Sequence, residues 1–383
     1  METDFTIDLP PGATLVGRAW RPDCDGPSLI AVRDGAVFDI SVPGTATMRD
    51  LLEAEDPAAL VRDADGDMLG SVEELAAGAK AETGLRLLAP NDLQAVKACG
   101  VTFARSMVER VIEERAAGDP ARAEAIRKEV GALIGDSLRN LVAGSDKAMQ
   151  VKSALVEAGL WSQYLEVGIG PDAEVFSKAQ PMSSVGWGAR VGLHPVSAWN
   201  NPEPEVVLAC DSRGRVKGAT LGNDVNLRDV EGRSALLLGK AKDNNASAAI
   251  GPFIRLLDAG FGIDDVRDAE LQLTVEGKDG YRLEGHSSMS EISRDPLDLV
   301  AQTCGPHHQY PDGFMLYLGT LFAPTQDRDV PGEGFTHKVG DVVTIRSEKF
   351  GALVNTVDLS TNCPPWTFGT GALMRNLAGR GLI

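Results

Sequence analysis

The sequence predicts an α+β protein with mainly antiparallel sheets and a separate group of helices. Turn sequences at 33–35, 211–214 and 279–280 each separate two apolar runs, as in a β-hairpin. Residues 103–160 instead repeat apolar side chains at the helical period. Strand and helix patterns do not alternate regularly, so a doubly wound parallel sheet is not expected.

The N-terminal part begins with predicted strands at 13–20, 28–32 and 36–40, followed by a helical region at 46–82. Acidic residues 63–67 interrupt this region and resemble the start of a calcium loop, with Glu74 at loop position 12. Met68 stands at position 6, where such a loop needs glycine. We interpret the segment 63–74 as a solvated acidic turn and keep a calcium site as the alternative.

The middle of the chain is predicted to be helical and the rest mainly β. Residues 85–100 look like a junction. In the helical region Met107 and Val111 are followed at the same period by Ile126, Val130, Leu133 and Ile134, and residues 118–120 break it into at least two helices. The later predicted strand pairs are 206–210 with 216–221, 271–276 with 281–285, and 341–346 with 352–357.

Composition excludes several classes of partner. The 383 residues carry a formal charge of −18, which argues against nucleic acid and against an anionic membrane surface. The five cysteines form no CxxC pair, the N-terminus lacks a basic secretory region, and no apolar run approaches a membrane span. These features predict a cytoplasmic protein.

Common catalytic motifs are missing from the sequence. It contains no phosphate-binding loop, no HExxH and no G-x-S-x-G. The adjacent pair His307 and His308 is interpreted as a loop or surface feature, because neighbouring side chains point apart on a strand.

Acidic residues form the strongest candidate site. Glu203 and Glu205 precede an apolar strand, and two residues apart in an extended segment point to one side. Asp224 ends the returning strand of the 211–214 turn, which brings it back toward the glutamates. Three carboxylates with open positions suit a hard divalent ion, Mg²⁺ or Mn²⁺.

The same region resembles the fumarylacetoacetate hydrolase family. Its E-x-E, N-D-[VW]-x-x-R-D, lysine and G-P motifs match residues 203–205, 223–229, Lys242 and 251–252. Residues 319–320 resemble its G-T loop, and 338–343 and 350–355 its closing strands. The resemblance implies Glu203, Glu205 and Asp224 as metal ligands and Lys242 as the active-site lysine.

The resemblance also implies the architecture. It predicts a mixed β-roll catalytic domain at 93–383 and a smaller N-terminal α/β domain at 1–92, in a homodimer or homotetramer.

One departure separates this sequence from the family's hydrolases. Their motif G-x-N-Y-x-x-H-x-x-E corresponds to residues 100–109, where Glu109 is kept but Ser106 replaces the histidine. Serine without a base cannot activate water as imidazole does, so elimination of water is favoured over hydrolysis. The motif spacings and residues 177–186 resemble the branch that dehydrates 2-keto-3-deoxy-D-xylonate (equally -arabinonate) to 2,5-dioxopentanoate, in pentose catabolism.

The resemblance leaves the individual roles open. Lys242 is either the base at C3 or a partner of a carboxylate, and Glu109 is a candidate acid or base. Ser106, Ser184 and Thr320 are candidate substrate-binding residues. Arg228 and Asp229 are interpreted as a structural ion pair.

Two other functions compete with the dehydratase. One is a metal-dependent hydrolase or decarboxylase of a 2,4-diketo acid or oxaloacetate, with His194 or His286 supplying the missing imidazole. The other is a metal-dependent binding protein without turnover.

Overall fold

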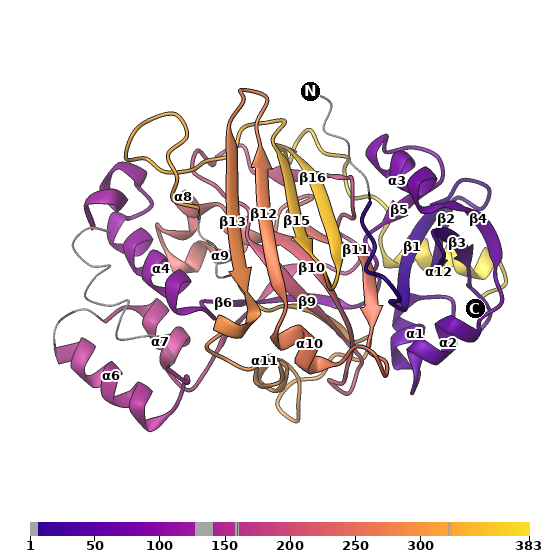
Figure 1. Ribbon diagram of the computed structural model, residues 1–383, viewed down its shortest axis with the longest axis horizontal. Coiled ribbons are helices and arrows are strands. Elements are labelled where there is room, and N and C mark those ends of the chain that lie inside the picture. Colours follow the sequence, from indigo (N-terminus) through magenta and orange to yellow (C-terminus); the bar gives the residue numbers. More distant parts are fainter. Residues whose placement is uncertain (1–6, 127–140, 158, 160, 321, 323) are drawn as a thin grey trace.

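Two β-sheets pack face to face at the centre of the protein, with helices at both ends (Figure 1). The structure is a computed structural model that describes residues 7–126, 141–157, 159, 161–320, 322 and 324–383. Nearly all strand pairs are antiparallel, and the parallel ones among the described strands are β14 with β6 and β16 with β8. The α+β prediction is therefore confirmed.

The larger sheet has eleven strands and contains both early and late parts of the chain. Its order is β4 (Asp67–Ser71), β3 (Ala36–Asp39), β2 (Gly26–Arg33), β1 (Leu15–Arg21), β11 (Ala248–Leu256), β10 (Val216–Asp224), β9 (Pro204–Cys210), β14 (Phe314–Tyr317), β6 (Ala95–Gly100) and β7 (Glu174–Ala179). Strand β5 (Arg86–Leu88) pairs with β1 off this path.

The smaller sheet has five strands. Its order is β13 (Arg282–Ser288), β12 (Glu270–Glu276), β15 (Val342–Ser347), β16 (Gly351–Leu359) and β8 (Arg190–Leu193). Apolar side chains of the two sheets meet in one core, for example Leu208 and Leu221 with Leu273 and Ile345. Every residue of β9 is buried, which explains why the run from Val206 to Cys210 is continuously apolar instead of alternating.

The acidic segment near residue 65 does not form a calcium loop. Residues 67–71 are strand β4 and pair with β3, between helices α2 (Pro57–Asp63) and α3 (Val72–Lys80). The carboxylate of Glu74 accepts the Ser71 backbone N–H at 2.7 Å and caps α3. The calcium alternative is therefore wrong, because its loop is extended where it should turn and Glu74 faces its own helix.

Three helices lie at one end of the sheets, at the left of Figure 1: α4 (Ala104–Ala116), α6 (Asp146–Glu157) and α7 (Gln163–Ile169). The chain breaks after α4 at residues 117–119 as predicted, and residues 120–126 are again helical. Val130, Leu133 and Ile134 lie outside the described residues. Met107 and Val111 of α4 pack with Leu165 and Ile169 of α7.

Shorter elements connect the strands. They are α1 (Met48–Glu53), α8 (Arg228–Glu231), η2 (Ala235–Leu237), α9 (Leu238–Lys242), α10 (Ile263–Arg267), η3 (Met289–Glu291), α11 (Pro296–Thr303) and α12 (Thr370–Gly379).

Contacts cross the predicted boundary at residue 92. Strand β1 pairs with β11, so one sheet continues from the N-terminal part into the rest of the chain. Helix α12 lies among the N-terminal strands, at the right of Figure 1, where Asn376 Nδ2 donates to the Cys24 carbonyl at 2.8 Å. The division into 1–92 and 93–383 stays a prediction.

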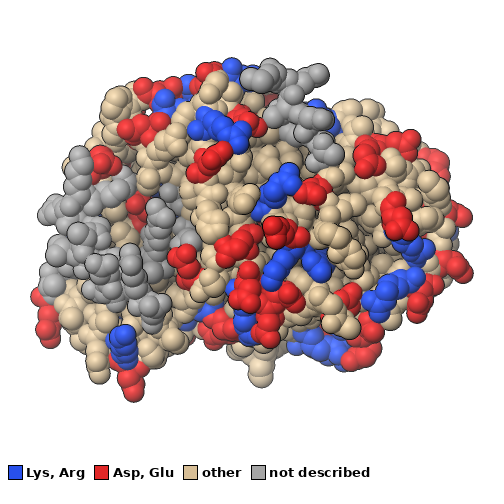
Figure 2. Space-filling model, viewed as in Figure 1, with Lys and Arg blue, Asp and Glu red and all other residues tan. Residues whose placement is uncertain are grey.

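Charged side chains are spread over the surface. Asp and Glu lie all over the face in view, with Lys and Arg between them (Figure 2). Within the described residues, no helix combines the length and apolar character that a membrane crossing requires.

Candidate active site

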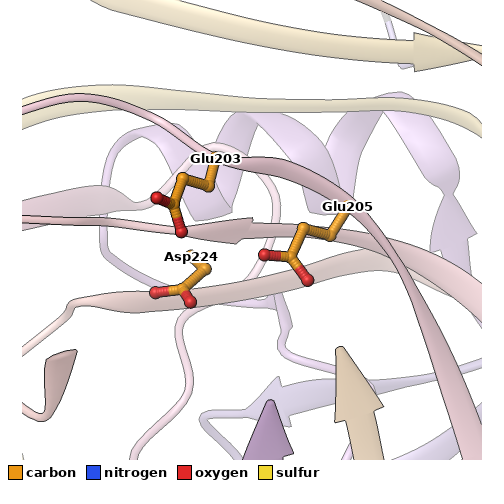
Figure 3. A group of neighbouring side chains, drawn as sticks. All are labelled: Glu203, Glu205 and Asp224. Atoms are coloured by element: carbon orange, nitrogen blue, oxygen red, sulfur yellow. The ribbon is translucent and has the colours of Figure 1, made fainter. Parts of the chain in front are cut away.

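A β-hairpin brings three buried carboxylates together. Strand β9 pairs with β10 so that Glu205 lies opposite Gly222, and the Asp224 backbone N–H donates to the Glu203 carbonyl at 3.0 Å. The carboxylates of Glu203, Glu205 and Asp224 turn toward one another (Figure 3), with one oxygen of each within 4.8 Å of the others. None of the three residues is more than 4% exposed.

Two buried lysines neutralise part of this charge. The ammonium of Lys242, at the end of α9, lies 2.6 Å from Glu203 Oε2 and 3.0 Å from Asp224 Oδ2. The ammonium of Lys178, in β7, lies 2.8 Å from Asp224 Oδ1 and also donates to the Val225 and Lys242 carbonyls. Both lysines therefore contact the acidic group directly.

The surroundings shift the pKa values of Glu203 and Glu205 in opposite directions. Burial opposes ionisation of Glu203, but Lys242 and Arg110 outweigh it and lower its pKa to about 2. Burial, with the charges of Asp224 and Glu203, raises the pKa of Glu205 well above its usual value. Without further positive charge the triad therefore keeps a proton on Glu205.

Helix α4 supplies a third cation, Arg110. The Arg110 guanidinium lies 2.6 Å from Glu113 and 3.2 Å from Glu231, and it also pairs closely with Glu203. Glu113 is in turn bound by Arg228, whose Nη1 donates to the Pro324 carbonyl at 3.0 Å. Arg228 thus fixes α4 to the loop that follows β14.

Glu174 adds a carboxyl group that lies outside the triad and titrates near neutral pH. It lies in β7 opposite Gly100 of β6, and a Cβ atom at Gly100 would come within 1.9 Å of the Glu174 carboxylate. Burial, then the charges of Glu231 and Glu203, raises the pKa of Glu174 to about 7. It can therefore gain or lose a proton near neutral pH.

The loop after β14 closes another side of the site. The Gly319 backbone N–H donates to Glu205 Oε2 at 2.6 Å and so orients that carboxylate. Gly319 has φ +90°, and a Cβ there would lie 2.1 Å from Thr102 Oγ1, so glycine is needed. Thr320 follows directly at the cavity wall.

These groups surround one narrow cavity of about 20 Å³. Its lining consists of Cys99, Gly100, Val101, Ser106, Arg110, Glu174, Phe176, Glu203, Glu205, Asp224, Glu231, Lys242, Gly319 and Thr320. Five carboxyl groups against two cations leave the lining with an excess of negative charge even when Glu205 is protonated, which favours binding of a further cation.

The structure brings most of the expected residues together but not all. The cavity includes Lys242, Ser106 and Thr320 with the triad, while Glu109 is outside its lining, 3.8 Å from Arg228. Ser184 lies in a separate groove and accepts a bond from Asn91 Nδ2 at 3.4 Å.

The expected ion pair of Arg228 with Asp229 does not form. Arg228 turns to Glu113, while Asp229 accepts bonds from the Ser197 hydroxyl and the Ala198 N–H. Neighbours in a short helix point in different directions, so each finds a partner elsewhere.

Four cavity or near-cavity residues were missed by sequence reasoning: Lys178, Arg110, Glu174 and Glu231. Lys178 stands within the 177–186 segment that carried the resemblance, so its signal was present. Arg110 directly follows Glu109, and only the rotation of α4 shows which of the two faces the cavity. Nothing in the sequence singled out Glu174 before the pairing of β6 with β7 was known.

Comparison with known proteins identifies the region around the triad. Residues 202–358 match the fumarylacetoacetate (FAA) hydrolase C-terminal family. The match covers less than half of the chain, and over these residues the chain is similar to that family. The matched segment of the chain contains the metal-ligand candidates, Lys242 and the Gly319–Thr320 loop.

Two curated relatives are similar in sequence. The probable 2-keto-3-deoxyxylonate dehydratase of Haloferax volcanii is 30% identical over 201 residues, which cover 52% of this chain and 65% of the relative. The 2-dehydro-3-deoxy-D-arabinonate dehydratase of Saccharolobus solfataricus is 29% identical over 184 residues, covering 48% and 58%. The chain thus spans less than two thirds of the length of each relative.

Solved structures share the fold over nearly their whole length. The apo form of 2-keto-3-deoxy-D-arabinonate dehydratase has a TM-score of 0.64 and 20% identity, over 90% of this chain and 99% of that one. A structure of that dehydratase complexed with magnesium and 2,5-dioxopentanoate has a TM-score of 0.62, 19% identity and the same coverage. The fumarylacetoacetate-hydrolase-type fold is therefore confirmed.

The donor set of the triad fits a hard divalent cation. Its carboxylate oxygens converge in a buried position, and such oxygens are the ligands that Mg²⁺ and Mn²⁺ prefer. Three carboxylates provide only part of an octahedral shell, so positions remain for a substrate or water. The residues present therefore fit the metal that the family resemblance implied.

Proposed function

We propose that this protein is a Mg²⁺-dependent hydro-lyase that converts 2-keto-3-deoxy-D-xylonate (equally -arabinonate) to 2,5-dioxopentanoate and water in pentose catabolism. The observation that carries the proposal is the buried carboxylate triad, which opens into a cavity whose lining contains no histidine among the described residues. The names of the two curated relatives support the same substrate.

Glu203, Glu205 and Asp224 are proposed to hold Mg²⁺, or Mn²⁺ in its place. A divalent ion there supplies positive charge that stabilises the negative charge developing on the keto oxygen when a C3 proton leaves. Gly319 positions Glu205 through its backbone N–H, and Lys178 fixes Asp224.

The other cavity groups are proposed to move protons and orient the substrate. Glu174 has a pKa of about 7 and is suited to exchange a proton with C3 or with the departing C4 hydroxyl. Lys242 is proposed to pair with carboxylates and not to act as the base at C3, because its ammonium contacts both Glu203 and Asp224. The charges of these two residues raise the pKa of Lys242 against the effect of burial, so it stays protonated. Ser106 and Thr320 are placed to contact substrate oxygens.

Two sequence candidates have weaker support. Glu109 faces Arg228 and is proposed to help hold α4, in place of acid–base chemistry. Ser184 is separated from the cavity and is not proposed as a substrate ligand.

The cavity favours elimination over hydrolysis. Hydrolysis needs a base that activates water, and neither suggested substitute, His194 or His286, is in the cavity lining. His194 Nδ1 accepts the Val196 N–H at 3.1 Å, and His286 is exposed on β13 and paired with Glu270 at 2.6 Å. Removing water from a β-hydroxy ketone needs only proton transfer and a stabilised keto oxygen. Activity on a 2,4-diketo acid or on oxaloacetate is therefore not expected, and the experiment below measures both.

The first experiment follows the reaction by proton NMR. Protein with Mg²⁺ and 2-keto-3-deoxy-D-pentonate should produce the aldehyde of 2,5-dioxopentanoate or its hydrate, and EDTA should stop the reaction. Unchanged pentonate, with turnover of oxaloacetate or a 2,4-diketo acid instead, would reject the proposed substrate. Binding of Mg²⁺ and the pentonate without any turnover would indicate a binding protein.

The metal assignment has a sharper test in Glu205→Gln. Because Glu205 holds a proton in the metal-free protein, the amide should preserve that fold in EDTA. The variant should lose turnover and should not gain thermal stability from Mg²⁺, whereas the wild type gains it. Glu291→Gln, at an exposed carboxylate, is the matched control; Mg²⁺ stabilisation of Glu205→Gln equal to that of the wild type would contradict the assignment.

We propose a homodimer or homotetramer in the cytoplasm, without nucleic-acid or membrane partners. Exposed Trp366 and Met374 near the C-terminal helix support an association surface, and the five free cysteines suit a reducing compartment. Light scattering coupled to size exclusion measures the assembly.

A further inference from the structure

Arg110 lines the cavity but has no role in the reaction proposed above. It lies one turn after Ser106 on α4, and both side chains line the cavity. Among the described lining residues, Arg110 and Lys242 are the cations. The two have different surroundings, which determine what each can bind.

Lys242 is fully engaged within the triad. Its ammonium contacts two of the three carboxylates, Glu203 and Asp224, and is 3% exposed. Lys178, which contacts Asp224, is completely buried and does not line the cavity. Neither ammonium is placed to meet an incoming anion.

Arg110 lies beside the triad. Its terminal nitrogens contact only one triad carboxylate, that of Glu203, and otherwise reach Glu113 and Glu231 outside it. Its side chain remains 13% exposed. Glu113 is already paired with Arg228 at 2.5 Å, so Arg110 is not needed to neutralise it.

The chemistry of a 2-keto acid explains what such a guanidinium would meet. When a 2-keto acid chelates a cation through its keto oxygen and one carboxylate oxygen, the second carboxylate oxygen stays free. A guanidinium next to a metal ligand can bind this oxygen with a charge-assisted hydrogen bond, and its planar fork offers several donors. The pull of Glu203 on Arg110 also weakens once that carboxylate shares its charge with a cation.

We propose that Arg110 is the residue that binds the C1 carboxylate of the substrate and so selects 2-keto acids over neutral ketones. This inference rests on the proposed function for the identity of the substrate. It is narrower than that function, because it concerns recognition of the carboxylate and holds for any 2-keto acid.

The test uses pyruvate, the simplest probe that has the keto and carboxylate groups but no C4 hydroxyl. Binding to Mn²⁺-loaded protein is measured by calorimetry and by the relaxation of Mn²⁺-bound water, so no turnover is needed. Arg110→Met should raise the pyruvate dissociation constant about tenfold or more, and Arg110→Lys by less. Methyl pyruvate, which lacks the charge, should bind weakly to all variants.

A structural role predicts a different pattern. If Arg110 only holds the site together, Arg110→Met weakens Mn²⁺ and pyruvate binding alike. If it binds the carboxylate, Mn²⁺ affinity is unchanged or higher, because a cation next to Glu203 has been removed. The control is Arg115→Met, which replaces an exposed arginine on the same helix.

Each result decides the proposal. Selective loss of pyruvate binding in Arg110→Met supports it, while unchanged pyruvate binding, or no binding of pyruvate to Mn²⁺-loaded wild type, overturns it. Turnover of the pentonate by the wild type is measured separately. Absence of turnover with selective pyruvate binding would reject the proposed dehydration but keep the carboxylate assignment.

Discussion

At the scale of single residues, Glu174 shows how position creates reactivity. A glutamate in water is ionised at neutral pH, but burial next to Glu231 and Glu203 raises the pKa of Glu174 to about 7. The folded protein therefore binds a proton there that the unfolded chain releases above about pH 4.5. Its contribution to stability is complete at low pH and is lost as the pH rises through 7.

The variant Glu174→Gln imitates the protonated carboxyl group and cannot release its proton. In EDTA, the free energy of unfolding of the wild type should fall between pH 5 and pH 8 more steeply than that of the variant. With Mg²⁺ the variant should lose about 10²-fold or more in kcat with little change in KM, since a proton-transfer group is missing. Urea unfolding at several pH values and steady-state kinetics measure the two effects.

The two measurements separate chemistry from folding. Glu291→Gln, at an exposed site, should change neither of them. Parallel stability curves for wild type and Glu174→Gln would contradict the raised pKa, and an unchanged kcat would remove Glu174 from the proposed mechanism.

At the scale of elements, the pairing of β6 with β7 places the reactive carboxyl. Gly100 lies opposite Glu174, and the missing side chain at Gly100 provides the space that the carboxylate fills. The φ of Gly100 is not positive, so its backbone accepts other residues. Glycine is therefore needed at position 100 to leave room for the Glu174 carboxylate, and not because of the backbone conformation.

Gly100→Ala should displace the Glu174 carboxylate, because a Cβ atom would lie 1.9 Å from its oxygen. Since that oxygen ends a flexible side chain, we expect the fold and Mn²⁺ affinity to be kept while kcat falls about tenfold or more. In a Glu174→Gln background the same change should cost little more. Gly239→Ala is the control, because a Cβ there meets nothing within 4 Å; additive losses in the double variant would show that Gly100 acts independently of Glu174.

At the scale of the whole molecule, contacts join the N-terminal part to both the large sheet and the C-terminal helix. Strand β1 joins the large sheet through β11, and α12 docks on the N-terminal strands through Asn376 and Arg380. Leu377 of α12 is 2% exposed and packs near Leu93. We therefore expect the proposed domains 1–92 and 93–383 to unfold together.

Leu377→Ala tests this coupling. Removing the buried side chain should cost about 2–5 kcal/mol and lower the temperature of a single calorimetric transition. Met374→Ala, on the exposed side of the same helix at 57% exposure, should have a much smaller effect. A new early transition that releases only the N-terminal part would show that 1–92 is an independent folding unit.

The sequence by itself determined the local features. Turn residues between apolar runs located the hairpins of β2–β3, β9–β10 and β12–β13, because turn chemistry is short-range. The pair β15–β16 was located by its two apolar runs alone. The same locality located the triad, since Glu205 and Asp224 lie on the two strands of one hairpin and Glu203 comes just before the first strand. Ordered motifs then indicated the family.

Only the tertiary structure decided which distant residues share the cavity. Glu174 and Gly100 meet through strands that are 74 residues apart in the chain numbering, and Arg110 reaches Glu203 across 93 residues. The rotation of α4, which turns Arg110 and not Glu109 to the cavity, depends on its packing against α7. Ser184 was separated from the site for the same reason: long-range packing, which a sequence pattern does not encode locally, sets where a side chain points.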